Sequence, residues 1–361
     1  MWRTLPILLA FAVIAVAAVA TEMDGVGVTV PDQGVRHLTD DPIHSIPIPS
    51  GGLSIVWVCQ GDQNDATLFI CSMYEIYEVD PATGTVLNQF PSAEGIHGLA
   101  WDGRYLIQNG YNTGTMWFSD KHTGQVYYSQ PSPGGYGIAW GKWDNPWDDQ
   151  WLWVTDFQDQ MMYQTDYYTG GSVVSFPVVG GIGAAWDGSH FWDSKWTTAE
   201  LNRYDPNTGV LLNTISAPQG NPRDICWDGH YLWTVHQESI AWQIDVWLNA
   251  GLYPVTQYLN PRYVLTHRGE WFTINATIKN HTDMVMSRDI WLEAQRVGTT
   301  FTKMVEGPVH VNLPPGAYIS VFRNLHVPNA APIDLWNLYI RCGEQYPVWD
   351  QQDGILVEIA P

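Results

Sequence analysis

Charged residues are scarce in this sequence, and basic residues are the scarcest. Lys, Arg, Asp and Glu make up 15% of the 361 residues, where about a quarter is usual in globular proteins. There are 16 basic and 37 acidic residues, which gives a formal net charge of −21. Such a chain repels phosphate backbones, because it has no cationic cluster to release their counterions. We therefore expect no nucleic acid partner.

Long apolar segments are also few. One uninterrupted apolar run, residues 7–20, follows Arg3 and ends in Ala18-Val19-Ala20, which is typical of a signal peptide cleaved after Ala20. A membrane-spanning helix needs about 17 to 25 apolar residues, which is more than this run offers. No later run approaches it in length. We therefore expect an exported protein, secreted or at the cell surface, with no membrane insertion after signal cleavage.

Cysteine is sparse as well. Four cysteines in an exported chain permit disulfides but do not make a disulfide scaffold of this size. Cys59 and Cys71 flank a loop rich in Gly, Asp and Asn, so they are the candidate disulfide pair, while Cys226 and Cys342 lie in other segments. The sequence leaves the alternative pairings open. Packing, rather than covalent links, must hold the fold together.

Aromatic and turn-forming residues are abundant. Aromatic residues make up 13% of the chain, with 20 Trp and 18 Tyr, beside 33 Gly and 23 Pro. Together with 45% hydrophobic residues, this composition excludes a disordered chain, a collagen and a coiled coil. It predicts an all-β fold packed by aromatic side chains.

Two short motifs recur along the chain and predict a repeat architecture. The first motif is Gly98-Leu-Ala-Trp101-Asp-Gly, Gly137-Ile-Ala-Trp140-Gly-Lys, Gly183-Ala-Ala-Trp186-Asp-Gly and Asp224-Ile-Cys-Trp227-Asp-Gly, with Trp spacings of 39, 46 and 41. The second motif, Asp-x-x-Thr-Gly, begins at Asp80, Asp120, Asp166 and Asp205. Both motifs favour hairpin turns, and a period near 40 with several short strands per unit is typical of a β-propeller.

The spacing predicts five blades within residues 43–257. The last unit lacks a convincing fourth strand, and residues 43–48 resemble the strand that ends the other units. We therefore expect this N-terminal strand to complete the last blade and close the ring, after a linker over residues 21–42.

The period stops after Tyr258. Period-two alternation in Trp271-Phe-Thr-Ile-Asn-Ala-Thr-Ile-Lys279 and in two later segments predicts an Ig-like β-sandwich over residues 258–361. Segments such as Leu313-Pro-Pro-Gly316 and Tyr346-Pro-Val-Trp-Asp350 resemble Ig-like modules that end many exported proteins of uncultured bacterial phyla. The repeats, through Trp-Asp-Gly-x-Tyr-Leu and Asp-Pro-x-Thr-Gly, resemble the bacterial propeller group that includes the five-bladed glutamine cyclotransferase family.

The predicted binding site lies at one mouth of the propeller channel. The loops before the innermost strands and those between the second and third strands open on the same face, and ligand sites are concave with a few convergent polar groups. Residues that differ between blades are the better candidates, since a residue repeated in every blade, such as Trp101, is structural packing. The candidate ligand-binding residues are His97, Tyr111, Tyr136, Asp156, Trp196, Arg223, His236 and Glu238.

The sequence offers residues for other chemistries as well. Glutamine cyclotransferase-like catalysis requires a carboxylate for proton transfer, whereas the corresponding segment carries the amides Gln108 and Asn109. A glycosidase requires two carboxylates, for which Asp156, Asp159, Asp193 and Glu238 are candidates. No cofactor is predicted; calcium at residues 143–149 is an alternative, because that segment is rich in Asp and Asn.

The sequence favours an exported, non-catalytic recognition or structural protein. The propeller face is expected to bind a glycan, a peptide or a surface partner, and the sandwich to act as a spacer or assembly module. The alternatives are an enzyme acting in the channel and a self-associating subunit of a fibre or surface layer. The absence of a nucleophile–base motif in the sequence favours binding over catalysis.

Overall fold

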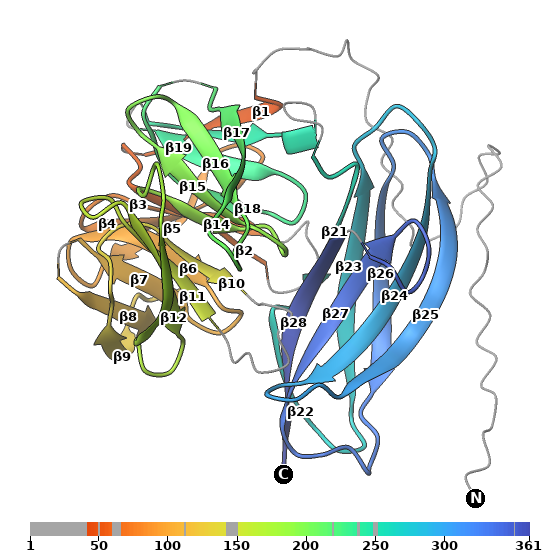
Figure 1. Ribbon diagram of the computed structural model, residues 1–361. Coiled ribbons are helices and arrows are strands. Elements are labelled where there is room, and N and C mark those ends of the chain that lie inside the picture. Colours follow the sequence, from red (N-terminus) through yellow and green to blue (C-terminus); the bar gives the residue numbers. More distant parts are fainter. Residues whose placement is uncertain are drawn as a thin grey trace, which may run out of the picture.

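The computed structural model describes residues 42–49, 51–59, 66–111, 113–141, 151–218, 220–236, 239–247, 252–349 and 351–361. These residues form an all-β protein with two parts that lie side by side (Figure 1). The predicted signal peptide, the linker up to residue 41 and the segment 143–149 lie outside the described residues. No described helix is long and apolar enough to cross a membrane.

The first part consists of four-stranded antiparallel sheets. The first three sheets are β2 (Ser54–Val58), β3 (Thr67–Cys71), β4 (Glu75–Val79) and β5 (Val86–Pro91); β6 (Ile96–Trp101), β7 (Leu106–Gly110), β8 (Thr115–Ser119) and β9 (Val126–Pro131); and β10 (Ile138–Gly141), β11 (Trp151–Asp156), β12 (Met161–Asp166) and β13 (Ser172–Pro177). The other two are β14 (Ala184–Trp186), β15 (Phe191–Lys195), β16 (Glu200–Tyr204) and β17 (Leu211–Ser216); and β18 (Pro222–Trp227), β19 (Leu232–His236) and β20 (Ile240–Ile244) with β1 (His44–Pro47).

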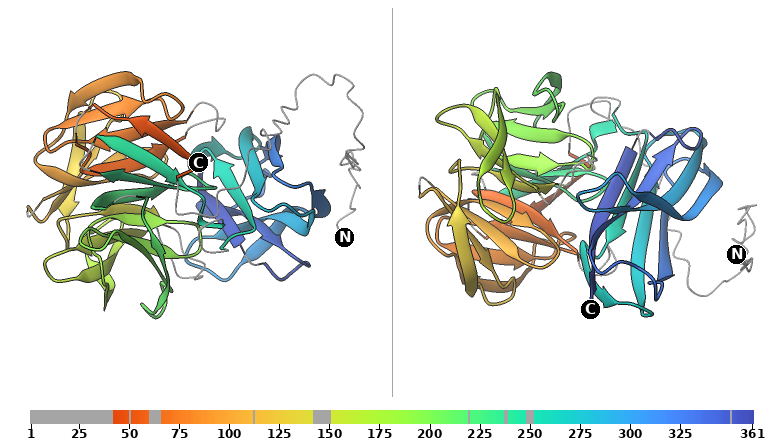
Figure 2. Two further views of the ribbon diagram at one scale, coloured as in Figure 1. Left: turned by 90° about the horizontal axis from the view of Figure 1, so that it is seen from above. Right: turned by 60° about the horizontal axis from the view of Figure 1, so that its bottom comes forward.

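Contacts between the innermost strands of these sheets close a ring, so the first part is a β-propeller. Figure 2 shows it beside the second part from two further sides. Strand β2 contacts β6 and β18, and β14 contacts β10 and β18, while β10 also contacts β6. Strand β1 pairs antiparallel with β20, with Ile46 opposite Ala241. The inner strands are buried and the outer strands, such as β9, are largely exposed. Apolar side chains between neighbouring sheets therefore hold the ring together.

The repeated motifs form the hairpins within each sheet. The Oδ1 atom of Asp102 accepts hydrogen bonds from the backbone N–H of Arg104 (2.7 Å) and Tyr105 (2.6 Å). In the Asp-x-x-Thr-Gly motif, Asp120 Oδ1 accepts from the backbone N–H of His122 (2.9 Å) and Thr123 (2.8 Å). Gly124 ends that turn at φ 71°, a left-handed conformation that glycine adopts without strain.

A polar side chain near the end of the second strand ties each of three sheets to the next one. Asn109 Nδ2 donates to the carbonyl of Tyr136 (3.0 Å), and Thr155 Oγ1 donates to that of Ile182 (3.2 Å). The Ser194 hydroxyl donates to the carbonyl of Arg223 at 3.4 Å. These bonds fix the backbone at the start of each innermost strand, which is where the candidate site lies.

The second part contains two sheets that pack over one apolar core. The three-stranded sheet has the order β21 (Val255–Asn260), β23 (Trp271–Asn280) and β26 (Tyr318–His326). The five-stranded sheet has the order β22 (Tyr263–His267), β28 (Gln351–Ala360), β27 (Leu335–Gly343), β24 (Met286–Arg296) and β25 (Thr302–Leu313). Ile274 and Ile278 of one sheet share a core with Leu338 and Ile355 of the other. This part, residues 255–361, is called the sandwich below, and its first strand begins before the predicted boundary at residue 258.

The sandwich contacts the propeller at the Asp-Gly hairpins. The backbone of Gly103 approaches Arg262 and Tyr263, that of Gly188 approaches Gln352, and that of Gly229 approaches the Tyr258 ring so closely that a Cβ would lie 2.3 Å from it. Gly229 has a φ of 101°, so both its conformation and this contact require glycine. One end of the propeller channel is therefore covered by the sandwich.

The predicted Cys59–Cys71 disulfide is not formed, and this prediction was wrong. Neither cysteine takes part in a disulfide, and both are buried. In the β2–β3 pair, Ser54 lies opposite Cys71 and Val58 lies opposite Thr67, so Cys59 comes at the other end of the hairpin. Four residues of strand span roughly 13 Å, whereas a disulfide needs Cα atoms within about 7 Å.

Candidate functional site

The uncovered end of the channel is formed by two classes of loop. The loops before the innermost strands and those between second and third strands are hydrogen-bonded to each other, as between Tyr111 N–H and the Gly95 carbonyl (2.8 Å) and between Ser132 N–H and the Gly114 carbonyl (2.9 Å). Both classes therefore lie on the face away from the Asp-Gly hairpins. We call this end the open mouth.

Four aromatic rings form a cluster at the open mouth. Tyr111 stacks on His97, with ring centroids 4.6 Å apart and an interplanar angle of 26°. Tyr136 meets both rings edge to face, at 5.5 Å from His97 and 5.4 Å from Tyr111, and Phe157 lies 5.6 Å from Tyr136. Tyr136 is 8% exposed and Tyr111 is 37% exposed. The structure thus brings three predicted residues together, with one face of Tyr111 against His97.

A cation lies near this cluster. The Arg223 guanidinium lies 4.7 Å from the centre of the Trp196 ring, which is a cation–π distance. Burial and, to a lesser extent, the charge of Arg223 lower the pKa of His97 to about 4. Burial, and then hydrogen bonding to Tyr111, raise the pKa of Tyr136 to about 12. At neutral pH the cluster therefore offers the neutral His97 imidazole and the neutral Tyr136 phenol, beside a guanidinium that stays charged.

Two further predicted residues serve the local structure. His236 is fully buried, donates from Nδ1–H to the Gly220 carbonyl (2.8 Å), and meets Trp242 edge to face at 4.1 Å. It is therefore not available to a ligand, because it ends β19 with its ring packed inward. Asp156 Oδ1 accepts from the backbone N–H of Gln158 and Asp159, which defines the β11–β12 turn. Glu238 lies outside the described residues.

Asp193 and Asp224 carry fully buried carboxyl groups in the propeller, and both are enclosed by hydrogen bonds. Asp193 accepts from the backbone N–H of Gly180 (3.0 Å) and Gly181 (3.1 Å) and from Asn202 Nδ2 (2.7 Å), and burial raises its pKa to about 6. Asp224 accepts from the backbone N–H of Ala184 at 3.0 Å.

Asp224 joins three sheets of the ring. Besides Ala184 in β14, it accepts from the backbone N–H of Ile55 (3.2 Å) and from the Ser54 hydroxyl, both in β2. Burial raises the pKa of Asp224 to about 8. Asp193 and Asp224 are both 0% exposed, so neither carboxyl reaches a ligand at the open mouth.

The covered end of the channel contains a small cavity of about 70 Å³, room for a few water molecules. Its wall comes from the innermost strands of every sheet, including the repeated tryptophans, and its floor from the sandwich residues Arg262, Gln352 and Asp353. Arg262 and Asp353 form an ion pair there. Each repeated tryptophan packs between neighbouring sheets, as Trp186 does on Trp153 at 5.8 Å.

The amides at Gln108 and Asn109 have structural roles. Gln108 accepts from the backbone N–H of Ala93 (2.8 Å) and donates to the Ser119 hydroxyl (2.7 Å). Among the described residues, no group of three or more His, Cys, Asp or Glu is arranged to hold a metal ion. The predicted calcium segment 143–149 lies outside them.

Sequence analysis missed three features of this region. Phe157 extends the aromatic cluster, Asp224 joins the ring, and Trp57 in β2 occupies the position of the repeated tryptophans. Asp224 could have been found by alignment of the repeats, because glycine occupies its position at 98, 137 and 183. Phe157 gives no such signal, since it lies in a loop that differs between units.

No protein-family model matches the chain. No curated protein matches it either. Among solved structures, it is similar to Myxococcus xanthus glutaminyl cyclase (14% identity, TM-score 0.45, 56% of this chain and 94% of that chain). It is also similar to the β-propeller domain of Myceliophteria thermophila Cps50 (Swd1) (17%, TM-score 0.35, 77% and 99%) and to Kuenenia stuttgartiensis hydrazine synthase (18%, TM-score 0.35, 70% and 66%). The fold assignment itself depends on the strand topology described above.

Proposed function

We propose that the protein is an exported, non-catalytic recognition protein whose open mouth binds a glycan. In this proposal the five sheets are the blades of a propeller that β1 closes, and the sandwich is an Ig-like spacer. The ligand site consists of Tyr111, Tyr136, His97, Trp196 and Arg223. The observation that carries the proposal is the aromatic cluster, because it presents a partly exposed tyrosine ring at the end of the channel that the sandwich does not cover.

The chemistry of the cluster matches a sugar ring. Tyr111 stacks on His97 and is 37% exposed, so its exposed part offers apolar surface on which the C–H face of a sugar can stack. The Tyr136 hydroxyl and the His97 imidazole are neutral and able to hydrogen-bond sugar hydroxyls. Arg223 adds donors that do not depend on pH.

A channel enzyme is the weaker alternative. Acid–base catalysis requires a carboxyl group within hydrogen-bond reach of the substrate. Asp193 and Asp224, whose pKa values are raised by burial, are surrounded by donors from the protein itself. This arrangement explains their raised pKa values by burial in the ring and supports a structural role.

The first test is a glycan array probed with the purified protein, followed by calorimetry with the best glycan. Tyr111→Ala and Trp196→Ala should each weaken binding by about two- to tenfold, since an aromatic contact contributes roughly 0.5 to 1.5 kcal/mol. Tyr168→Ala is the matched control, because Tyr168 is 55% exposed and lies in the β12–β13 hairpin away from the mouth. Equal affinities of all three variants and the wild type would reject the proposed site.

The pH dependence of binding sharpens this test. Because the pKa of His97 is lowered to about 4, its imidazole stays neutral from about pH 5.5 to 8. Affinity should therefore be flat across that range. A loss of affinity with a midpoint near pH 6.5 would mean that His97 titrates normally and that its buried contact with Tyr111 is not as described.

A further inference from the structure

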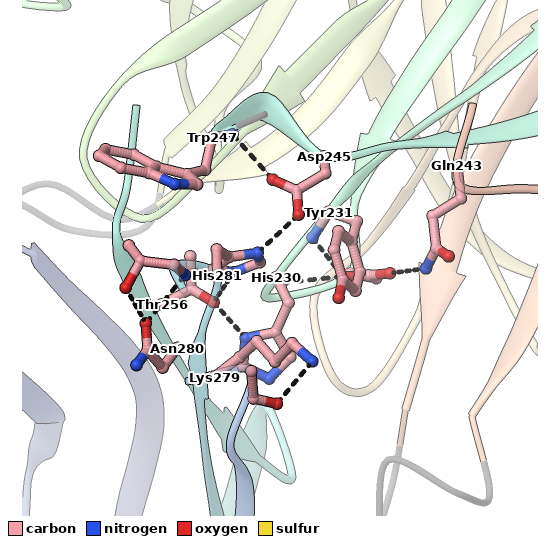
Figure 3. Close-up of polar contacts among 12 residues, drawn as sticks. His230, Tyr231, Gln243, Asp245, Trp247, Thr256, Lys279, Asn280 and His281 are labelled. Atoms are coloured by element: carbon pink, nitrogen blue, oxygen red, sulfur yellow. Dashed lines mark hydrogen bonds and ion pairs between the residues drawn. The ribbon is translucent and has the colours of Figure 1, made fainter. Parts of the chain in front are cut away.

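A chain of hydrogen bonds crosses the boundary between the propeller and the sandwich (Figure 3). Asp245 Oδ2 lies 3.0 Å from His281 Nδ1, and His281 Nε2 lies 2.8 Å from Thr256 Oγ1. Thr256 Oγ1 also contacts His230 Nδ1, whose Nε2 lies 3.1 Å from Thr277 Oγ1. Asp245 and His230 belong to the propeller, and the other three residues belong to the sandwich. We call these five residues the relay.

The hydrogen bonds of the relay cross between the propeller and the sandwich three times. Asp245 follows β20 and His230 lies in the β18–β19 hairpin, while Thr256 is on β21, Thr277 is on β23 and His281 follows β23. Every bond of the relay except that between His281 and Thr256 joins the propeller to the sandwich. The relay therefore serves as a polar clamp between the parts.

With both histidines neutral, the donors and acceptors of the relay have one consistent order. The Asp245 carboxylate accepts from His281 Nδ1–H, so His281 Nε2 accepts from the Thr256 hydroxyl. Thr256 Oγ1 then accepts from His230 Nδ1–H, and His230 Nε2 accepts from the Thr277 hydroxyl. Each polar atom has one partner of the right kind.

One additional proton reverses the direction of the hydrogen bonds along the relay, and a second proton leaves one of them without an acceptor. If His281 becomes an imidazolium, its Nε2–H donates to the Thr256 hydroxyl. That hydroxyl then donates to Nδ1 of His230, which carries its proton on Nε2 instead. If both rings are charged, both nitrogens next to Thr256 are donors, and the Thr256 hydroxyl proton loses its acceptor. The two rings, 6.4 Å apart, would also repel each other.

The surroundings oppose that second charge. His230 is 2% exposed, and burial, the neighbouring His281 and Lys279 lower the pKa of His230 well below its usual range. Lys279 donates to the Gly316 carbonyl at 3.2 Å. The rings of Tyr231 and Tyr318 lie against His281 and His230, and the Asp228 carboxylate accepts from the backbone of the same hairpin. Asp245, the carboxylate within the relay, contacts His281 rather than His230.

We propose that the relay makes the contact between propeller and sandwich sensitive to acid, so that the sandwich acts as a pH-dependent cap on the covered end of the channel. Separation gives His230 access to water and a normal affinity for protons. Below about pH 6.5 protons therefore favour the separated state over the docked state by about tenfold per pH unit. The channel end with its tryptophan-lined cavity opens as a result.

Hydrogen–deuterium exchange of the full chain at pH 7.5 and pH 5.0, corrected for intrinsic rates, tests the proposal. Protection of the amides at 228–231 and 255–259 should fall by about thirtyfold at pH 5.0, the factor for one histidine over 1.5 pH units. Protection at Ile274 and Leu338 in the sandwich core should not change, which distinguishes separation from unfolding.

His230→Gln keeps a polar group at Nε2 but cannot titrate, so the thirtyfold fall should shrink to less than about threefold. His267→Gln is the matched control: His267 is about half exposed, bonds to Glu270, and its loss should leave the fall intact. Equal protection of the wild type at both pH values, or a full response in His230→Gln, would overturn the proposal.

A measurement on the unmodified chain protects against a variant that does not fold. Imidazole nitrogen NMR should show His230 as a neutral ring at pH 7, because its pKa is lowered in the docked state. If His230 is an imidazolium at pH 6 while the amides at 228–231 stay protected, the proposal is wrong.

Discussion

The two ends of the propeller channel are made from the same repeat but use it differently. At the covered end, the same residue types recur in successive sheets: Trp101, Trp140, Trp186 and Trp227 pack between sheets. At the open mouth, the residue four positions before each of these tryptophans changes, from His97 to Tyr136, Ile182 and Arg223. Residues that recur in every sheet therefore pack the core, and residues that differ between sheets form the candidate site.

The ring and the contact with the sandwich differ in their response to protons. Asp224, which joins three sheets of the ring, has a raised pKa, so the fold retains a proton there. His230, which holds the sandwich at the covered end, has a lowered pKa, so the docked state excludes a proton. Acid should therefore strengthen the ring and weaken the cap.

The largest expected effect on stability comes from replacing one tryptophan by alanine at each end of the channel. Trp101 is 5% exposed and packs with Leu99 and Leu106, so Trp101→Ala should lower the free energy of unfolding by about 3 to 5 kcal/mol. Trp196→Ala should cost less than about 1 kcal/mol, because that side chain is only partly buried. Chemical denaturation followed by tryptophan fluorescence measures both. Similar losses in the two variants would contradict the distinction between the two ends.

A smaller effect is expected where the innermost strands meet. A Cβ at Gly137 would lie 2.6 Å from the Ala184 nitrogen and 2.7 Å from the Ile182 carbonyl oxygen, both backbone atoms. Gly137→Ala should therefore destabilise the propeller by about 1 to 3 kcal/mol through overpacking. Gly220→Ala is the control, since a Cβ there meets nothing within 4 Å. The midpoint of denaturation should shift in the first variant alone.

Much of the fold could be predicted because it depends on local rules. Asp-Gly and Asp-x-x-Thr-Gly determine hairpins by turn chemistry, and the alternation of short apolar runs determines strands. The observed pairing of β1 with β20 agrees with the expectation from residues 43–48. Cys59 and Cys71 show the limit of this approach: their spacing in sequence suggested a pair, but the register of β2 and β3 keeps them apart.

The site was predictable in part for a related reason. The positions of His97, Tyr136 and Arg223 follow from the repeat, so their proximity could be inferred. His236 also follows from the repeat, but its ring turns inward against Trp242, which depends on packing that the sequence does not reveal. The relay could not be predicted at all, because His230 and His281 become neighbours only when the sandwich docks.

The next prediction concerns the pH dependence of the ring. An acid with a raised pKa in the fold binds a proton that the unfolded chain releases, so stability falls as pH rises from about 4 to about 8. Asp224→Asn removes this contribution. Relative to the wild type, the variant should gain up to about 1.4 kcal/mol per pH unit between pH 5 and 7.

Denaturation of the variant and the wild type at pH 5, 6 and 7 measures this difference, with Asp166→Asn in an exposed turn as a second carboxyl-to-amide variant for comparison. Parallel pH profiles for Asp224→Asn and the wild type would show that Asp224 is ionised in the fold and would contradict the proposed role of burial.

The smallest expected effect separates repetition from burial. Asp120 is repeated but exposed, and it accepts from two backbone N–H groups in the β8–β9 turn. Asp120→Ala should cost about 1 kcal/mol, as the loss of a comparable capping side chain does, because water can replace much of the lost bonding. If repeated residues are structural even at the surface, Asp120→Ala should bind glycan with the affinity of the wild type. Tyr111 is also exposed but is not repeated, so Tyr111→Ala should bind glycan more weakly. Reduced glycan binding by Asp120→Ala with unchanged stability would mean that the repeated turns belong to the binding surface, and the inference from variation to site would fail.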